Sequence, residues 1–470
     1  MKRRDYLKLS GMSVVATTTG CVSTNGSNAS ETRVSFRREL QVKIETDVFI
    51  AGGGSAGLAA AVAAAESGAR VFLVEAHSCF GGMGTAGYVP TFMKMSDGIN
   101  FLAGGIGKRV VDNLKSERRI IGSATDIEAL KRVYDNLVVK SGAKFNFYTK
   151  LVDVQAADGK IDYVVCSSPS ELYAVRAKVY IDATGNGDLA VMAGANYEKG
   201  GENGMMPGTL CSLWGGIDWK AWNKSKPAVR QPQGYRLAEA FKDGIFTVKD
   251  LHMAGAFKFG ESYGGGNIGH VFNLDGTDAE SITTGLVAAR KSMMEYERYL
   301  NNYLKGFENA KLLSTASLLG VRETRRITGE YVLNIEDYKK RATFDDEIGR
   351  YSYSIDIHPS DGSDEKALKK HLDEIYKTYH YKRGESYGIP YRILTPQGFD
   401  NMLVAGRCVS ADQLVHGSIR VMPACFIMGQ AAGIAAAQAA SSGVSTRKID
   451  ILALQKRLKE FGAFLPNAKV

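Results

Sequence analysis

Apolar and polar residues alternate in blocks near the start of the chain, and the blocks predict regular structure. Asp47–Ala51 is a short apolar run, which is typical of a buried parallel strand. Leu58–Ser67 is rich in alanine and predicts a helix, and Gly68 follows it as a stop signal. Val71–Val74 is a second apolar run that ends at Glu75. The pattern therefore predicts one strand–helix–strand unit.

A glycine-rich turn joins the first predicted strand to the helix and fits G-x-G-x-x-G. Its candidate cofactor-binding residues are Gly52, Gly54, Ser55, Ala56 and Gly57. In this motif the three glycines permit a tight turn, a close approach to a pyrophosphate, and close packing of helix on strand. The helix N-terminus offers free N–H groups to phosphates. Glu75 lies where a carboxylate accepts the ribose hydroxyls. The motif predicts dinucleotide binding and leaves FAD and NAD open.

The rest of the chain divides by composition. Helices are expected at residues 102–117 and 125–141, and strands at 145–148, 150–155, 161–166 and 172–179, with a hairpin turn at 157–160. After about residue 197 the strand–helix rhythm stops, and it returns with a strand at 402–405 and a helix over Pro423–Ala440. That helix holds small residues suited to close packing, and we expect it to be too short and polar to span a membrane. The expected domains are an export signal at 1–21, a linker at 22–40, the first part of the nucleotide domain at 41–199, and an inserted substrate domain at 200–395. The chain is expected to return to the nucleotide domain at 396–445 and to end in a C-terminal helix or tail at 446–470.

The N-terminus predicts export rather than a folded element. Lys2–Lys8 resembles a twin-arginine signal, and Thr18–Cys21 resembles a bacterial lipobox, so Cys21 is the expected lipid attachment point. The expected location is the bacterial cell envelope, on its periplasmic or outer-surface side, with the membrane contacted only through this lipid. A basic tail on a cytoplasmic protein is the alternative.

Charge and cysteine usage exclude other classes. The formal charge is +9, but lysine and arginine are spread without a dense basic run, so no nucleic-acid partner is expected. No two cysteines have C-x-x-C spacing, which argues against an iron–sulfur cluster, a structural zinc or a disulfide framework. We expect buried free thiols and no metal site.

Several further blocks identify a family resemblance that covers about residues 44–440. They are Phe80–Met83, Ala183–Asp188, Gly320–Tyr331, Asp356–His358, Ile389–Arg392, Ala405–Arg407 and Arg420–Pro423. With the glycine motif, the chain resembles FAD-dependent oxidoreductases that group with the flavoproteins of fumarate reductase and heterodisulfide reductase. The resemblance implies an α/β fold: a Rossmann-like FAD-binding domain of the glutathione-reductase type, with an inserted α+β substrate domain. The absence of a second G-x-G-x-x-G agrees with FAD as the one nucleotide cofactor.

The resemblance also implies where the cofactor lies. Beyond the glycine motif and Glu75, the implied cofactor-binding residues are Gly81, Gly82, Met83, Val152, Ala183, Gly185, Asp188, Gly406, Arg407, Arg420 and Met422. Val152 is expected beside the adenine, and the N-terminus of the last helix beside the flavin. His77 and Cys79 lie near the expected flavin edge, but their spacing does not match a covalent attachment.

The candidate catalytic residues are His416, Arg420, Arg322 and His270. His416 and Arg420 lie in the loop just before the last helix, where they face flavin or substrate; the alternative is that Arg420 is a structural ion-pair partner. Arg322 and Arg326 are expected to share a helix face, as a clamp for a carboxylate or as part of a salt-bridge network that includes Glu323 and Arg325. His270 is a candidate general base, whereas His358 is expected to be structural.

The sequence thus predicts an exported, lipid-anchored FAD oxidoreductase that transfers a hydride between flavin and a small organic substrate, with an unknown electron acceptor. A carbohydrate-active lyase, which the family's xanthan lyase members suggest, and a surface binding protein with an inactive flavin site are the alternatives.

Overall fold

The computed structural model describes residues 36–201, 204–225, 235–252 and 255–470. The expected signal and lipid-attachment residue lie outside these ranges, and the linker lies mostly outside them. Residues 40–470 form one compact unit.

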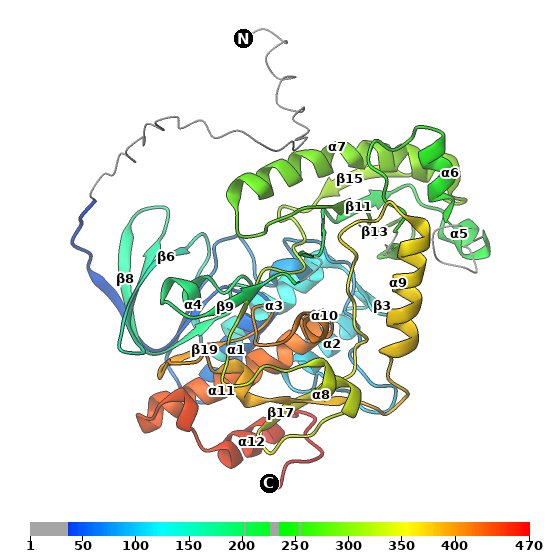
Figure 1. Ribbon diagram of the computed structural model, residues 1–470. Helices are drawn as coiled ribbons and strands as arrows, with labels where there is room; N and C mark the ends of the chain where they lie inside the picture. The colour runs from blue at the N-terminus through cyan, green and yellow to red at the C-terminus, as the bar shows by residue number, and fades with distance from the viewer. Residues whose placement is uncertain (1–35, 202–203, 226–234, 253–254) are drawn as a thin grey trace, which may run out of the picture. The chain divides into compact units, whose positions relative to one another are not determined.

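A sheet of mostly parallel strands is the centre of the fold (Figure 1). Its strands run in the order β5, β2, β1, β8, β7, β6, and β19 pairs with β8. The pairings β5–β2, β2–β1, β1–β8 and β8–β19 are parallel, whereas β8, β7 and β6 form an antiparallel meander. The bounds are β1 Val42–Ala51, β2 Val71–Val74, β5 Lys144–Asn146, β6 Lys150–Ala157, β7 Lys160–Ser167, β8 Leu172–Asp182 and β19 Met402–Val404.

Side chains alternate between the two faces of this sheet, as strand geometry requires. Val48 and Ile50 of β1 pack into a core with the helices α1, α2, α3 and α11. Phe49 and Ala51 face the other way, into a core with the meander and α4. The helices are α1 Ser55–Ala65, α2 Ile106–Ser116, α3 Ile127–Ser141, α4 Asp188–Met192 and α11 Met422–Ser442. The Rossmann-like α/β architecture predicted from the sequence is therefore confirmed.

Helices α1 and α11 touch through small residues. A Cβ on Gly429 would lie 2.1 Å from the carbonyl oxygen of Ala56, and one on Gly433 would lie 2.3 Å from that of Ala60. The predicted close packing is confirmed. Helix α11 is longer than expected, however, and is long and apolar enough to cross a membrane by length and composition. Its most apolar window is 89% buried inside the protein, as in a core helix.

We expect Gly429→Val to destabilise the protein by about 2–4 kcal/mol, because the added methyl groups force the two helices apart. Thermal unfolding of the purified variant measures this. Ser441→Val, at an exposed position of the same helix, is the matched control and should leave the midpoint unchanged. Equal midpoints for the two variants would contradict the proposed packing.

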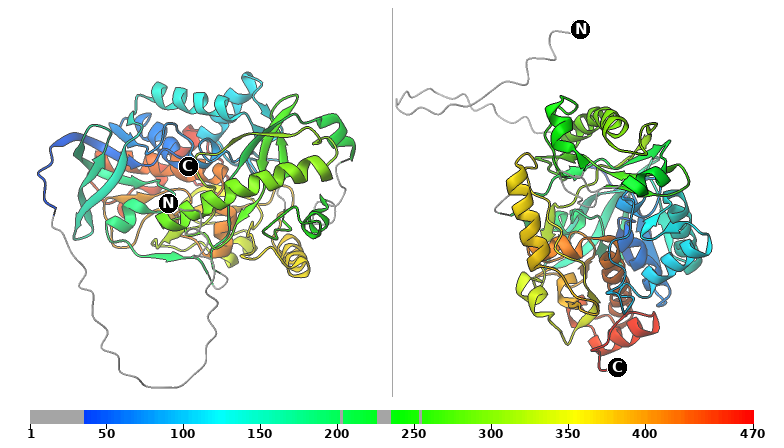
Figure 2. Two further views of the ribbon diagram at one scale, coloured as in Figure 1. Left: turned by 90° about the horizontal axis from the view of Figure 1, so that it is seen from above. Right: turned by 90° about the vertical axis from the view of Figure 1, so that its right-hand side faces the viewer.

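The described residues between 204 and 316 form a second layered region. A four-stranded antiparallel sheet, in the order β12, β13, β11, β15, packs with α5, α6 and the long helix α7 around its own hydrophobic core. Figures 1 and 2 show this region at the opposite end of the molecule from the C-terminal helix α12. The bounds are β10 Gly208–Thr209, β11 Ser212–Gly215, α5 Trp219–Ser225, α6 Leu237–Lys242, β12 Gly255–Lys258, β13 Tyr263–Asn267, β14 His270–Val271, α7 Ala279–Tyr303 and β15 Lys311–Thr315.

Residues 333–394 pack differently from the rest of the expected insertion. Leu333, Ile348 and Tyr387 belong to the same core as α1 and α11. Residues 200–395 thus contribute to two separate hydrophobic cores. The expected domain boundaries at 200 and 395 stay a prediction. The remaining elements are β3 Ile120–Ile121, β4 Ala124–Thr125, β9 Tyr197–Lys199, β16 Arg325–Ile327, α8 Ile335–Lys340, β17 Glu347–Tyr351, α9 Glu365–Thr378, β18 Tyr387–Pro390, α10 Gln413–Ile419 and α12 Ile451–Glu460, with short 3₁₀ turns at Gly82–Gly84, Tyr391–Leu394 and Thr446–Lys448.

Two local expectations were wrong. Arg322 and Arg326 do not share a helix face, since Arg325–Ile327 is strand β16, which pairs with β9. The residues before Arg420 are not a loop but helix α10, whose N-terminus is capped by Asp412 through a 2.7 Å bond from the Val415 N–H.

Candidate active site

The glycine turn has the geometry that the motif requires. Gly52 has φ +92°, and a Cβ there would lie 2.5 Å from the Ala183 carbonyl oxygen. A Cβ on Gly57 would lie 1.8 Å from the Gly52 oxygen, so only glycine fits both positions. Gly54 is different, because a Cβ there would meet no protein atom within 4 Å. The open space at Gly54, at the N-terminus of α1, is where a pyrophosphate would approach the backbone.

The other residues expected to hold the cofactor gather around this turn. Glu75 is buried and accepts bonds from the N–H groups of Gly53 at 2.7 Å and His77 at 2.8 Å, which fixes its carboxylate. The N–H of Gly81 donates to the Gly53 carbonyl at 2.8 Å, and Gly81 and Gly82 both have positive φ. The N–H of Thr149 donates to the Glu75 carbonyl at 3.0 Å, which aligns the start of β6, and hence Val152, with the end of β2. Val152 itself is 39% exposed, and its contact with adenine stays a prediction.

Helix α11 begins beside the same turn. A Cβ on Gly84 would lie 2.5 Å from the sulfur of Met422, so the glycine-rich loop after Glu75 packs on the first residue of α11. Met83 precedes that glycine, and Ser55 and Ala56 are buried in the first turn of α1. A Cβ on Gly406 would lie 3.1 Å from that of Ala56. These contacts bring together the glycine turn, the loop after Glu75, Gly406 and the start of α11, all of which were expected to bind the same cofactor.

Arg407 and Asp188 lie at the same strand ends but bind protein groups. Arg407 is partly buried and donates to the Gly185 carbonyl at 3.0 Å, to the Asn186 side-chain oxygen at 2.6 Å, and to the Val321 carbonyl. Asp188 accepts from Arg325 at 2.9 Å. Both residues therefore tie the ends of β8 and β19 to neighbouring segments, and their contact with the cofactor stays a prediction.

Two of the four predicted catalytic residues, Arg420 and His270, belong to one series of short contacts, and a third, Arg322, lies near it; we call the whole group the histidine–arginine cluster. It consists of Asp250, His252, His270, Arg322, Asp356, His358 and Arg420. Arg420 donates to Asp356 at 3.2 Å, and Asp356 lies 3.4 Å from Nε2 of His358. Nδ1 of His358 lies 2.9 Å from Nε2 of His270, whose Nδ1 lies 3.2 Å from Asp250.

Arg322 joins the cluster from the side of β10. It is buried and donates to the Thr209 hydroxyl at 2.9 Å and to the Pro207 carbonyl at 2.8 Å. Thr209 pairs directly with His270 in the β10–β14 ladder. Among the described residues no carboxylate lies within ion-pair distance of Arg322. Burial, together with the positive charge of Arg420, lowers the pKa of Arg322 to about 10.

Electrostatics in the cluster favour charged carboxylates and the neutral forms of His252 and His358. Burial alone would raise the pKa of Asp356, but His358, Arg420 and Arg322 outweigh it and hold the pKa below its usual range. Burial, with the nearby His270, lowers the pKa of His252 to about 4. Burial, with the charge of Arg322, also lowers the pKa of His358 well below its usual range. The charges of the site are thus those of the two arginines and of the carboxylates Asp250 and Asp356.

His416 lies apart from this cluster. Its side chain is wholly buried in α10, and its Nε2 donates to the Arg407 carbonyl at 2.8 Å. Burial, with Arg420 nearby, lowers the pKa of His416 well below its usual range. The residue therefore supports the end of β19 in this arrangement, and its catalytic role stays a prediction.

The charged residues after Arg322 form a salt-bridge network, one of the two expected alternatives. Arg326 is buried and donates to Glu323 at 2.7 Å and to Glu198 at 3.3 Å. It also binds the carbonyls of Ala411 and Gly200, and so joins β16, β9 and the segment before α10.

Sequence reasoning missed Asp250, His252 and the role of His358. His270 and His358 are 88 positions apart, and the spacing of cysteines carries no information about histidines that meet only in the folded chain. The block Asp356–His358 was a signal, since the resemblance had already singled it out. The expectation of buried free thiols is confirmed for the described residues: Cys79, Cys166, Cys211, Cys408 and Cys425 are all buried and unpaired with one another.

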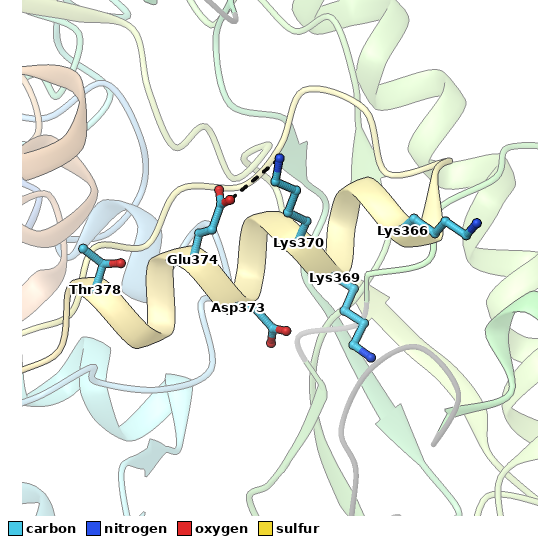
Figure 3. A pocket seen from close by; sticks show the side chains of 6 residues that line it. All are labelled: Lys366, Lys369, Lys370, Asp373, Glu374 and Thr378. Carbon is cyan, nitrogen blue, oxygen red and sulfur yellow. Dashed lines mark ion pairs between the residues drawn. The ribbon is translucent and has the colours of Figure 1, made fainter.

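The surface of the described part of the chain includes two hollows of interest. One is lined only by side chains of α9, among them Lys370 and Glu374, which form an ion pair (Figure 3). It includes no residue of the glycine turn or the cluster. The other has a volume of about 710 Å³ and is lined by Val248, Phe272 and Ser360, each two positions from a cluster residue. Phe272 also packs on the His270 ring, with ring centroids 5.5 Å apart. The second hollow therefore lies next to the cluster.

Comparisons with known proteins agree with the glycine turn. The model of the family described as FAD dependent oxidoreductase matches residues 47–458. A search of curated proteins found no match. Among solved structures, the chain is 13% identical to a geranylgeranyl bacteriochlorophyll reductase-like protein from Thermoplasma acidophilum, over 89% of this chain and 82% of that one, with a TM-score of 0.42. It is also 13% identical to p-nitrophenol 4-monooxygenase from Pseudomonas putida, over 89% and 86%, with a TM-score of 0.39. At such TM-scores these likenesses carry no argument about the reaction.

The family match spans most of the chain, from the first residues of the glycine-turn unit to α12. The open backbone at Gly54 and the buried Glu75 fit the dinucleotide half of FAD. The chain belongs to the FAD dependent oxidoreductase family, and FAD is its cofactor.

Proposed function

We propose that this oxidoreductase transfers a hydride between FAD and a small organic substrate that carries an anionic group, held by Arg322 and Arg420. The convergence of Arg322, Arg420 and His270 on one buried cluster is the observation that carries this proposal. Bound FAD supplies the hydride acceptor or donor. The residues of the chain supply the placement of the substrate, which is most of what such chemistry requires.

An anionic substrate matches the charges of the cluster. Arg322 has no carboxylate partner among the described residues, and Nε of Arg420 is buried without a hydrogen-bond partner. Buried guanidinium groups retain a strong preference for carboxylate or phosphate oxygens, which they bind through two N–H groups at once. A carboxylate or similar anion would satisfy both arginines and fix the orientation of the reacting carbon.

The position of Arg420 connects the cluster to the cofactor residues. Arg420 lies two positions before Met422, which packs on the loop after Glu75. The thiol of Cys425, in the first turn of α11, lies 3.4 Å from the Arg420 carbonyl. The hollow beside Phe272 lies next to the cluster and is the proposed place of entry for a small molecule.

His270 and His416 receive positioning roles in this proposal. Both ring nitrogens of His270 already face other side chains, at 2.9 and 3.2 Å. Neither nitrogen is therefore free to take a proton from a substrate in this arrangement. His416 is wholly buried behind Arg407.

Anaerobic flavin spectroscopy on the purified protein tests the proposed function. A panel of small carboxylates, sugars and steroids is mixed with the oxidised protein, and separately with the dithionite-reduced protein. Loss or return of the visible flavin absorbance with a carboxylate supports the proposal. Turnover of a polysaccharide with no change of flavin colour would instead support the lyase alternative.

We also propose that the protein is exported by the twin-arginine route and anchored by a lipid on Cys21. The support is the basic start Lys2–Lys8 and the Thr18–Cys21 sequence. This route carries folded proteins, which suits a chain that acquires a tightly held cofactor before export.

Labelling with a radioactive fatty acid in a bacterial host checks the anchor. We expect the wild-type chain to incorporate label and to sediment with membranes, and Cys21→Ser to do neither. Cys79→Ser, at a buried cysteine of the folded region, is the control and should remain labelled. Label on the Cys21→Ser chain would contradict this proposal.

A further inference from the structure

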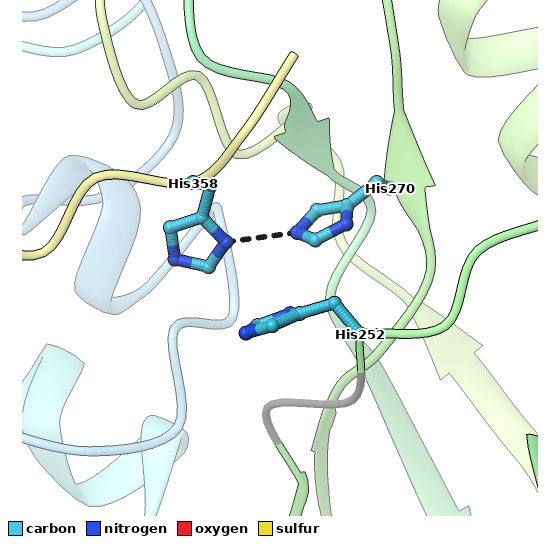
Figure 4. Close-up of side chains that lie close together, drawn as sticks. All are labelled: His252, His270 and His358. Atoms are coloured by element: carbon cyan, nitrogen blue, oxygen red, sulfur yellow. Dashed lines mark hydrogen bonds between the residues drawn. The ribbon is translucent and has the colours of Figure 1, made fainter. Parts of the chain in front are cut away.

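Three histidines of the cluster come together from three separate segments (Figure 4). His252 precedes β12, His270 begins β14, and His358 follows β17. Each offers one ring nitrogen, and these three nitrogens lie within 4.8 Å of one another. The His252 ring centroid lies 5.0 Å from that of His270 and 4.7 Å from that of His358. Such a convergence of imidazoles within a protein interior requires an explanation.

The hydrogen-bond partners of the His270–His358 pair favour a cation between the two rings. Nδ1 of His270 faces the Asp250 carboxylate, and Nε2 of His358 faces the Asp356 carboxylate, so both outward nitrogens should carry protons. A neutral imidazole carries only one proton. The two inward nitrogens, Nε2 of His270 and Nδ1 of His358, lie 2.9 Å apart and would then present lone pairs to each other. A cation that both lone pairs can share, either a proton or a metal ion, removes this conflict.

His252 distinguishes between these two cations. Two imidazoles are enough to share a proton, so a shared proton does not explain why a third imidazole lies beside the pair. Nδ1 of His252 is buried and has no hydrogen-bond partner among the described residues, which is costly for a polar atom. Three imidazoles, two of them backed by carboxylates, form the arrangement by which proteins hold and orient metal ligands.

We propose that His252, His270 and His358 bind a divalent transition-metal ion, with Asp250 and Asp356 orienting two of the rings. The proposed flavin reaction requires no such ion, so this site goes beyond that function. Zinc–nitrogen bonds of about 2.0–2.1 Å place tetrahedral ligand atoms about 3.3 Å apart. The inward nitrogens of His270 and His358 thus separate by a few tenths of an ångström on binding, and His252 moves toward them.

The surrounding charges indicate what completes the coordination. Arg322 and Arg420 contribute two positive charges, which Asp250 and Asp356 balance. The charge of the metal ion then remains to be neutralised within a low-dielectric site. We therefore expect an anionic fourth ligand, either hydroxide or the anionic group of a substrate held by the arginines.

Zinc titration of the flavin-loaded, full-length protein tests the site. The protein is treated with a chelator, exchanged into metal-free buffer and titrated with Zn²⁺ in a calorimeter, and bound zinc is then measured by atomic emission. We expect one Zn²⁺ per chain, with FAD content unchanged. No saturable binding to the wild-type protein would overturn the proposal and leave a shared proton between His270 and His358.

Variants locate the bound ion. His252→Ala and His358→Ala should each lose stoichiometric zinc, and Asp250→Asn should weaken binding about 10- to 100-fold through the second coordination shell. His380→Ala, at an exposed histidine of another segment, is the control and should bind zinc as the wild type does. FAD content and the visible flavin spectrum report whether each variant is folded. Wild-type zinc affinity in a folded His252→Ala or His358→Ala chain would overturn the assignment.

Discussion

Replacing Arg420 by alanine is expected to slow anaerobic flavin reduction, or reoxidation, by the substrate about 100- to 1000-fold while FAD remains bound. A donor directed at the reacting substrate typically contributes this much. Arg420 lies at the junction of α10 and α11, and donates to both the carbonyl and the carboxylate of Asp356. Its Nε remains free for another acceptor. Stopped-flow absorbance of the flavin measures the rate.

Two comparisons make this experiment specific. Arg392→Ala removes an arginine whose side chain is 49% exposed and paired with Asp346, and it should leave the rate unchanged. Arg420→Lys keeps the charge but not the planar pair of donors, so it should recover only part of the rate. A folded, FAD-containing Arg420→Ala protein with the wild-type rate would remove Arg420 from the site.

Replacing Gly57 by alanine is expected to abolish FAD binding. The new Cβ would lie 1.8 Å from the Gly52 carbonyl oxygen, so the turn cannot keep its shape. The apoprotein should also become less stable, by about 1–3 kcal/mol, since overpacking acts on the folded protein itself. The FAD-to-protein ratio after gel filtration, and the thermal unfolding midpoint of the apoprotein, measure the two effects.

Gly54→Val is the matched variant for this experiment. Gly54 has an extended conformation that any residue adopts, and its Cβ would meet no protein atom within 4 Å. The side chain would instead occupy the space left for the pyrophosphate. We therefore expect weak FAD binding with an unchanged apoprotein midpoint. Full FAD occupancy in Gly54→Val would show that the cofactor does not approach this turn.

The nucleotide unit was predictable because its local pattern and its tertiary structure agree. Val71–Val74 is a strand with the bounds that its apolar run suggests, and both faces of it are buried. The hairpin at residues 157–160 was predictable for the same reason, since Asp158 and Gly159 take the positive φ that such a turn requires. At these positions the residue types are compatible with few other backbone conformations.

Helix α10 was not predictable from local propensity. Its sequence includes His416, Gly417 and Ser418, which do not favour a helix. The Asp412 cap and the burial of Val415 and Ile419 stabilise it instead. Tertiary packing overrode local preference, and the same holds for β16, where pairing with β9 replaced the expected helix.

Three members of the candidate site were predictable, but its other members and its assembly were not. His270, Arg322 and Arg420 could be identified one by one, because each is a reactive residue type in a distinctive block. Their meeting depends on Asp356 and His358, which connect Arg420 to His270 across the fold. Contacts between segments this far apart in the sequence depend on how the sheets and helices pack, which no local sequence pattern indicates.

Arg322 and Arg420 are proposed to select an anionic substrate for the flavin, and matched ligand pairs test this central claim most directly. Each carboxylate that changes the flavin redox state is compared with its neutral amide in anaerobic stopped-flow measurements on the wild-type protein. We expect the carboxylate to react at least about 100-fold faster than its amide, a difference that the loss of a charged, bidentate contact produces. Equal rates for a carboxylate and its amide would contradict the claim.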